Sequence, residues 1–343
     1  VEPVPKIGAG KIACPLERGL KPQNARLWVY GEALRRKNAG QRRGKIAAHE
    51  LISVALNMPI IRSMDGCRWH KAHETEKHYG ELFLRKQEKL CVAACARFRT
   101  LNFIEDHAWL MSQAANTLAM LLHSRRTIFP VFNGMASLSI PAYLYRALEN
   151  IKIHALHGCA RDVETLLKLL SPLSLEPVDY VNYYLMTIDD AASLPALAVP
   201  PRGLTLRRPN RGDIERLLII QAEYEKEEVL PPGASLNPYS VRLTVDRMLA
   251  GESALVAELD RRLVGKININ AEGWSRCQIG GVYVIPDCRG TGIGRHMTQT
   301  FVRLLISRGW GINLFARTNN FPALKTYLGA GFKKESNYSI VYI

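Results

Sequence analysis

A glycine-rich loop between a strand and a helix is the part of this sequence best suited to chemistry. The loop runs from Arg289 to Gly294 as Arg-Gly-Thr-Gly-Ile-Gly. The preceding residues 281–285 are rich in β-branched and aromatic side chains, and Pro286 removes the donor that further pairing would need. Glycines let a ligand approach the backbone, and the first N–H groups of a helix have no internal partner. The loop therefore predicts a site for a phosphate or pyrophosphate.

The spacing of these glycines separates the loop from two common nucleotide-binding motifs. Its third glycine comes too early for the dinucleotide fingerprint, and no Lys-Ser or Lys-Thr pair closes it as in a P-loop. The segment instead resembles the acyl-CoA-binding motif of the GCN5-related N-acetyltransferase (GNAT) superfamily, Arg/Gln-x-x-Gly-x-Gly/Ala after a Val-x-Val-x-Pro strand. The matching residues are Val282, Val284, Pro286, Arg289, Gly292 and Gly294.

A second segment downstream strengthens this resemblance. Residues 320–332 read Asn-Phe-Pro-Ala-Leu-Lys-Thr-Tyr-Leu-Gly-Ala-Gly-Phe. They are similar to the superfamily's closing motif Asn-x-x-Ala-x-x-x-Tyr-x-x-x-Gly-Phe, which places Asn320 and Tyr327 at its polar positions. The resemblance covers residues 204–343 and does not extend to the rest of the chain.

The elements expected around these motifs follow the order of that superfamily. A strand at 204–208 precedes helices at 214–228 and 240–250, then strands at 254–259, 263–270 and 279–285, the helix after the loop, a strand at 312–317 and a last helix and strand. The resemblance implies a mixed α/β sheet with the GNAT acyl-CoA acyltransferase fold at 204–343. Prolines make residues 189–203 a linker.

The amino-terminal part is organised differently. Residues 1–45 contain eleven lysines or arginines against three acids, which predicts a basic, loosely structured arm. Residues 46–188 form a helical and α/β domain, with a helical stretch at 107–123, strands at 127–132, 152–157 and 178–188, and helices at 140–150 and 162–170. This domain vaguely resembles the degenerate first half of a two-part acetyltransferase. It lacks a glycine loop, so we expect it to bind no CoA and to shape the acceptor groove or join two protomers.

The resemblance implies roles for specific residues. Val282 and Val284 would pair through their backbone with the pantetheine arm, and an N–H near Val284 would polarise the thioester carbonyl. The pyrophosphate would be held by Arg289 and by the N–H groups of Gly290, Thr291, Gly292, Ile293 and Gly294. Asn320 would contact the CoA arm, and Tyr327 would be the general acid for the leaving thiolate. The alternative is that Tyr327 is an ordinary core residue whose hydroxyl has a hydrogen-bond partner within the protein.

The general base is less clear from the sequence. The strand segment Gln278 to Gly281 carries no acid, so a carboxylate must come from elsewhere. Glu272 precedes that strand, and Glu228 ends a cluster of four glutamates at 223–228, beside the expected acceptor groove. Most of these acids are solvated helix charges in the simplest interpretation. As catalytic candidates, they favour a cationic acceptor such as a primary amine.

Composition and charge limit the remaining possibilities. The chain has 343 residues, a net charge of +15 and seven scattered cysteines, which favours reduced thiols and a cytoplasmic location. No apolar run reaches the length of a membrane span. One cysteine and three histidines at 67–78 do not match zinc spacings, so we expect a polar helical face there and no metal.

Two functions follow as expectations. The first is an acetyl-CoA-dependent N-acetyltransferase acting on an amine of a small molecule, peptide or protein, with residues 200–343 binding acetyl-CoA by themselves. The alternative is a non-catalytic acyl-CoA sensor or a nucleic-acid-associated protein that uses the basic arm. A solvated basic segment that binds nothing is the simpler interpretation of that arm.

Overall fold

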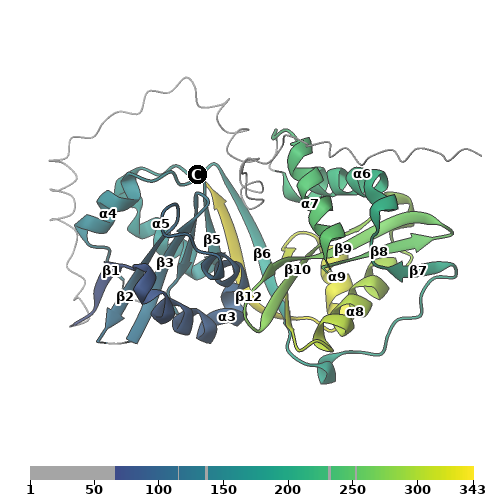
Figure 1. Cartoon of the computed structure of the whole chain (residues 1–343), viewed down its shortest axis with the longest axis horizontal. Coiled ribbons are helices and arrows are strands. Elements are labelled where there is room, and N and C mark those ends of the chain that lie inside the picture. Colours follow the sequence, from purple (N-terminus) through teal and green to yellow (C-terminus); the bar gives the residue numbers. More distant parts are fainter. Residues whose placement is uncertain (1–65, 115, 136–137, 231–232, 252) are drawn as a thin grey trace, which may run out of the picture.

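The computed structural model describes residues 66–343, except 115, 136–137, 231–232 and 252 (Figure 1). The expected basic arm at 1–45 and the first twenty residues of the domain expected at 46–188 lie outside the described residues. Within the described part of the chain, no helix is long and apolar enough to cross a membrane.

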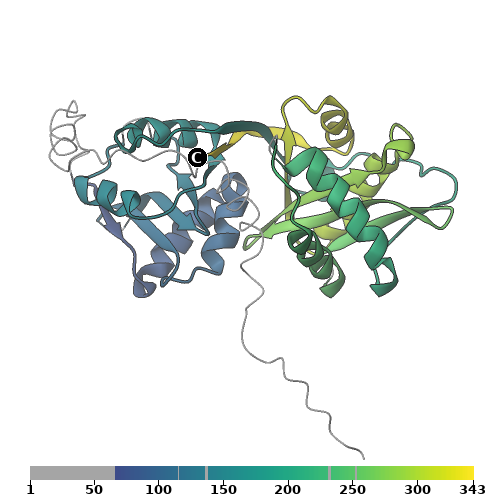
Figure 2. The same ribbon diagram turned by 90° about the horizontal axis from the view of Figure 1, so that it is seen from above.

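One mixed sheet of twelve strands runs through the molecule, in the order β1-β2-β3-β4-β5-β12-β6-β11-β10-β9-β8-β7. The sheet carries two lobes, which Figures 1 and 2 show side by side. The carboxy-terminal lobe contributes β7 (Leu204–Arg207), β8 (Ala254–Leu259), β9 (Arg262–Glu272), β10 (Arg276–Val284) and β11 (Gly311–Arg317). The amino-terminal lobe contributes β1 (Arg68–Lys71), β2 (His107–Gln113), β3 (Asn116–Ser124), β4 (Thr127–Val131) and β5 (Ala155–Cys159).

Helices cover both faces of the sheet in the carboxy-terminal lobe. Alternate residues of β8 show this, because Ala254 and Val256 pack in the cluster of α6 (Ile214–Tyr224) and α7 (Pro238–Ala250). Leu255 and Ala257 point the other way, into the cluster that includes α8 (Ile293–Ile306) and α9 (Phe321–Gly329). The predicted element order of this lobe is confirmed, with the first helix ending in a π-turn, η6 (Glu225–Val229).

The amino-terminal lobe differs from the prediction for residues 107–123. Residues 107–123, expected to be a helix, form the antiparallel strands β2 and β3. Ala108 and Leu110 of β2 pack with α3 (Lys77–Arg99), while Trp109 and Met111 pack with the opposite cluster, which includes α4 (Ala142–Glu149) and α5 (Ala160–Leu169). A strand that is buried on both faces reads as a continuous apolar run, so alternation is lost from the sequence.

The segment at 67–78 also differs from the polar helix that we expected. Residues 68–71 form β1, which pairs with β2, and a 3₁₀ turn follows at Glu74–Glu76. Among the described residues, no group of three or more His, Cys, Asp or Glu side chains is placed to hold a metal ion.

The two lobes repeat the same order of elements. In the first, β1, α3, the meander β2–β4, α4, β5, α5 and β6 (Asp179–Ile188) follow one another. In the second, β7, the α6–α7 pair, the meander β8–β10, α8, β11, α9 and β12 (Lys333–Tyr342) follow in the same sequence. In both, the strand after the meander pairs in parallel with the last meander strand. The chain is therefore built from an internal structural repeat.

The last strand of each lobe crosses into the other. β6 of the first lobe pairs antiparallel with β11 of the second along residues 183–188, and β12 of the second pairs antiparallel with β5 of the first along residues 338–342. β6 and β12 also pair with each other, and Figure 2 shows these two strands bridging the lobes. Residues 200–343 consequently lack a strand from inside the sheet. Binding of acetyl-CoA by residues 200–343 alone therefore stays a prediction, for a fragment that would lack β6 between β11 and β12.

A buried carboxylate also ties the lobes together. Glu88 of α3 is 4% exposed and accepts hydrogen bonds from the N–H groups of Trp274, Ser275 and Arg276, at 2.5, 3.0 and 3.1 Å, in the turn between β9 and β10. The Ser275 hydroxyl donates a fourth bond at 2.6 Å. These donors would be unsatisfied without the carboxylate, so Glu88 fixes α3 against β10.

Replacing Glu88 with alanine should therefore lower the free energy of unfolding by about 3 kcal/mol, because several buried donors lose their acceptor. Urea denaturation followed by circular dichroism measures the loss. Glu81→Ala is the matched control, since Glu81 lies two turns earlier on α3 and forms only an exposed pair with Arg85. Equal stability of the two variants would refute the role of Glu88.

Candidate functional site

The site begins where β10 and β11 separate. The two strands pair in parallel only from Arg276 to Ile279 on one side and from Gly311 to Leu314 on the other. A bulge between Gly280 and Tyr283 then shifts the pairing of β10 with β9. Beyond Ile279, the β10 edge that faces β11 is thus available to a ligand.

Gly281 makes the bulge. Its φ is +58°, and a Cβ there would lie 2.1 Å from Oδ1 of Asn268, so only glycine fits without a shift of its neighbours. The buried ammonium of Lys266 donates to the Gly281 carbonyl at 2.9 Å and lies over the ring of Tyr224. This lysine therefore provides a hydrogen-bond donor to a backbone carbonyl within the bulge.

The glycine loop has the open geometry that an anion requires. Gly290 and Gly292 have φ values of +77° and +91°, and a Cβ on either would meet nothing within 4 Å. Residues 289–292 are exposed, whereas Ile293 is buried and anchors the start of α8 in the core. The Thr291 hydroxyl donates to the Cys288 carbonyl at 2.7 Å, which closes the turn. The free N–H groups at the start of α8 thus lie beside open space, so the residues present fit a pyrophosphate.

Arg289 has protein partners in this structure. Its guanidinium makes a bidentate pair with Glu227 at 2.8 and 2.7 Å, and its Nε donates to the Val284 carbonyl at 2.9 Å. The group also lies over the ring of Tyr283. The hydrogen bond with Arg289 holds the pKa of Glu227 below its ordinary value. The predicted pyrophosphate contact of Arg289 therefore competes with an existing ion pair.

A cavity of about 570 Å³ opens at the separated strands and reaches the amino-terminal lobe. Its walls include residues 278–282 of β10 and 314–317 of β11, with Val282 among them. Tyr327 and Glu228 line the same space, and the opposite wall comes from α3, β4 and β5. Val284 lies nearer the loop, close to Gly294 of α8. The repeat therefore brings both lobes to one chamber, which we call the central cavity.

Tyr327 lies on α9 with 8% of its surface exposed. Burial raises the pKa of its phenol well above the ordinary value, and the nearby Tyr224 and Glu228 raise it further. The ring packs edge-on against Phe332. A phenol that keeps its proton at neutral pH beside a cavity is suited to act as a proton donor.

Glu228 is the carboxylate that the structure brings to Tyr327. Its Oε1 accepts from Nδ2 of Asn320 at 2.9 Å, and its backbone carbonyl accepts from Arg317 at 2.8 Å. Burial raises the pKa of Glu228, although the charge of Arg317 opposes the shift. A half-buried carboxylate with a raised pKa is suited to accept a proton.

Asn320 has a role that the sequence did not indicate. Its Oδ1 accepts from the N–H of Ala323 at 3.0 Å and so caps the start of α9, while its amide holds Glu228. Asn320 therefore positions both α9, which carries Tyr327, and Glu228.

Glu272, the other proposed base, is not part of this arrangement. It is exposed at the end of β9 and lines a neighbouring depression with Arg99 and Thr100, outside the central cavity. Its backbone carbonyl accepts from Arg99 at 3.0 Å. The meander turns Glu272 toward α3, whereas nearness in sequence to β10 had suggested the groove.

Sequence reasoning missed the cavity residues that come from the first lobe and from α7. These include Arg97 on α3, Arg125 in the turn between β3 and β4, and Arg247 on α7. They belong to no motif and are distant in sequence from the glycine loop. The only available signal was the general excess of basic residues.

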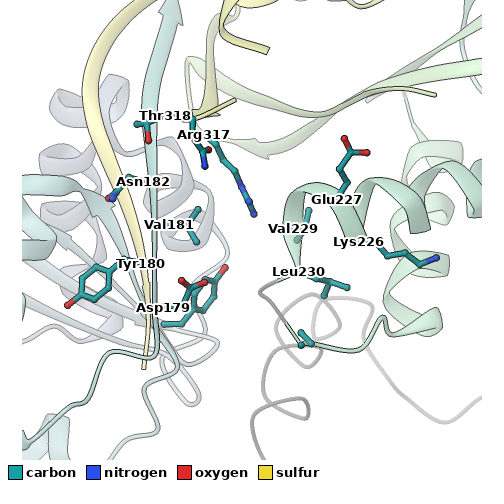
Figure 3. A pocket seen from close by; sticks show the side chains of 14 residues that line it. Asp179, Tyr180, Val181, Asn182, Lys226, Glu227, Val229, Leu230, Arg317 and Thr318 are labelled. Atoms are coloured by element: carbon teal, nitrogen blue, oxygen red, sulfur yellow. The ribbon is translucent and has the colours of Figure 1, made fainter. Parts of the chain in front are cut away.

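A second cavity of about 600 Å³ lies between the start of β6 and the η6 turn. Figure 3 shows the side chain of Arg317 extending into the gap between Val181 on one wall and Val229 on the other. Val229, Arg317 and Tyr342 line both cavities. Arg317 therefore lies where the second cavity meets the central one.

A comparison with protein families finds a likeness in the carboxy-terminal lobe. The model of the acetyltransferase (GNAT) family matches residues 220–332, which include both motifs and Glu228. A search of curated proteins finds no match for the chain.

Solved structures extend the likeness to both lobes. A GCN5-related N-acetyltransferase from Sphaerobacter thermophilus has 18% identity and a TM-score of 0.55, over 81% of this chain and 96% of that one. A Drosophila protein has 12% identity and a TM-score of 0.57, over 80% and 98%. A tandem GNAT protein from the clavulanic acid biosynthesis pathway has 12% identity and a TM-score of 0.50, over 81% and 98%. At sequence identities this low, the likeness to these structures shows a shared fold and nothing more.

The pair between Arg289 and Glu227 gives a first test of the loop. If Arg289 turns to an incoming pyrophosphate, Arg289→Ala should weaken acetyl-CoA binding about tenfold or more, because charge-assisted hydrogen bonds are lost. Glu227→Gln should leave the affinity unchanged or improve it, since a competitor for Arg289 is removed. Calorimetry on the full chain measures both.

The exposed pair of Arg262 with Asp287 provides the matched control, and Arg262→Ala should not change the affinity. Equal weakening by Arg289→Ala and Glu227→Gln would instead show that the ion pair supports the loop and that Arg289 does not hold the ligand.

Proposed function

We propose, from the premise that residues 220–332 form a domain of the acetyltransferase (GNAT) family, that this protein transfers an acetyl group from acetyl-CoA to an amine. One observation carries the proposal. The gap between β10 and β11, the phenol of Tyr327 and the carboxylate of Glu228 all border a single cavity. A proton acceptor and a proton donor therefore flank the place where a strand-like ligand can pair.

The residues that would hold acetyl-CoA follow from the loop and the bulge. The N–H groups from Gly290 to Gly294 would bind the pyrophosphate, with Arg289 released from Glu227 to join them. The backbone of Val282 and Val284 would pair with the pantetheine arm, and an N–H near Val284 would donate to the thioester oxygen. Asn320 would support this arm indirectly, through α9 and Glu228.

In the proposed reaction, Glu228 accepts a proton and Tyr327 donates one. When bound, acetyl-CoA supplies the thioester carbon that accepts the amine nitrogen while the C–S bond breaks. Glu228 accepts one proton from the acceptor's ammonium group and passes it to solvent. Tyr327 donates its proton to the leaving sulfur and recovers one from the nitrogen as the amide forms. The raised pKa of Tyr327 keeps its phenol protonated, and the raised pKa of Glu228 makes its carboxylate a stronger base.

The first lobe is proposed to be a degenerate copy that binds no CoA. The segment between β4 and α4 has no Arg/Gln-x-x-Gly-x-Gly sequence. The N–H of Phe132, at the end of β4, already donates to Oδ2 of Asp162 at 3.0 Å, so an internal carboxylate occupies this part of the copy. What the first lobe contributes instead is a wall of the central cavity.

Tyr327→Phe tests the proposed acid. Turnover of acetyl-CoA with an accepted amine should fall roughly 10²- to 10⁴-fold, while acetyl-CoA affinity stays nearly unchanged. Tyr239→Phe is the control, because Tyr239 is 69% exposed on α7 and does not line the cavity. Unchanged turnover in Tyr327→Phe would rule out this role. Acetyl-CoA binding by the wild type without turnover of any amine would favour the sensor alternative.

Glu228→Gln tests the proposed base through the pH dependence of kcat/KM. Burial disfavours the carboxylate, so in the wild type this group should lose its proton, and activity should rise, at a pH above its ordinary pKa of 4.5. The variant should lose this acidic limb and retain only the titration of the acceptor. Glu223→Gln, on the exposed side of α6, should keep the wild-type profile. An identical profile in Glu228→Gln would exclude Glu228 as the base.

A further inference from the structure

The central cavity has a charge that the proposed chemistry does not use. Among the described residues that line it, four are arginines, Arg97, Arg125, Arg247 and Arg317, and Glu228 is the only carboxylate. Arg317 donates to the backbone carbonyl of Glu228 at 2.8 Å. His157 adds no charge, since burial lowers its pKa to about 3. The lining of the central cavity is therefore more basic than acidic, which is unfavourable for a purely cationic acceptor.

Arg125 and Arg247 reach this lining from different lobes. Arg125 occupies the two-residue turn between β3 and β4, where it and Arg126 have φ values of +51° and +65°. Such a turn has little freedom, so the position of Arg125 is set by the hairpin. Arg247 comes from the last turn of α7. The pairing of β6 and β12 joins the two lobes and so holds both elements at the same cavity.

The two arginines share one electrostatic environment. Burial lowers the pKa of each, and the charge of Arg247 lowers that of Arg125 further. Asp106 and Glu105 act on Arg125 in the opposite sense, but neither lines the cavity, and the Asp106 carboxylate accepts from the N–H of Asn102. Two half-buried cations near each other at one surface provide a place for an anion.

We infer that the acceptor is a small amine that also carries an anionic group, a carboxylate or a phosphate, which Arg125 and Arg247 hold while the amine faces Glu228. The inference rests on the proposed function and narrows its substrate class. The cavity volume of about 570 Å³ suits a small molecule beside the end of a pantetheine arm. Binding of the anion by both lobes would also explain why the first lobe is needed although it lacks a CoA loop.

Pairs of amines that differ only in the anionic group test this inference on the full chain. Glutamate and β-alanine are compared with glutamine and β-alaninamide, and phosphoethanolamine with ethanolamine. In the wild type, kcat/KM for anionic members should exceed that of their neutral partners at least tenfold, and the carboxylate and phosphate pairs show which anion is preferred. Arg125→Ala and Arg247→Ala should remove this difference mainly by raising KM.

Matched controls lie beside both arginines. Arg126→Ala changes the other positive-φ residue of the same turn without touching the cavity lining, and Arg242→Ala removes an exposed arginine of α7 that pairs with Asp246. Both should keep the wild-type preference. Arg125→Lys should recover part of the preference, because it restores the charge but loses the bidentate geometry.

Failure of the inference can be told apart from failure of the proposed function. The inference of an anionic acceptor would be wrong if neutral or cationic amines were acetylated as efficiently as their anionic partners and Arg125→Ala changed nothing. The proposed acetyltransferase activity would still stand. If acetyl-CoA binds but no amine is acetylated, the proposed function fails. Calorimetry of the CoA-saturated protein with the anionic amines then tests the anion site by itself. Binding that Arg125→Ala abolishes would still support the anion site, and absence of binding would overturn it.

Discussion

The structure depends on the pairing of β6 with β12 at the centre of the sheet. Residues 179–187 of β6 pair with residues 333–342 of β12. In addition, β6 of the first repeat pairs with β11 of the second, and β12 of the second repeat pairs with β5 of the first. Neither lobe can complete its sheet without the other, because an inner strand that is removed leaves two unpaired neighbours. The Glu88 carboxylate adds a second connection at the turn between β9 and β10.

This pairing also determines the site. It places α3 and the turn after β3 opposite the gap between β10 and β11. The enclosed cavity takes its proposed proton-transfer groups from one lobe and its arginines from both. The repeated fold has thus acquired two roles. One copy keeps the glycine loop and the pair Glu228 and Tyr327, while the other contributes Arg97 and Arg125 to the same space.

The sequence predicted the carboxy-terminal lobe well because its motifs are local. The loop from Arg289 to Gly294 and the segment from Asn320 to Phe332 each combine backbone and side-chain requirements within a few residues. The strands at 107–123 were mistaken for a helix because both of their faces are buried, which removes the alternation that marks a strand. Glu272 was misplaced, and Arg125 and Arg247 were missed, because their positions depend on the meander turns and on the strand exchange, which leave no local pattern.

The central claim is that the gap between β10 and β11, and no other place in the two lobes, receives the acyl donor and directs it to Tyr327 and Glu228. A crystal structure of the full chain with acetyl-CoA tests it most directly. The account predicts one molecule, with its pyrophosphate at Gly290 to Gly294 and its thioester in the central cavity between Tyr327 and the β10 bulge. A molecule bound instead between β4 and β5, or a thioester remote from Tyr327, would contradict it.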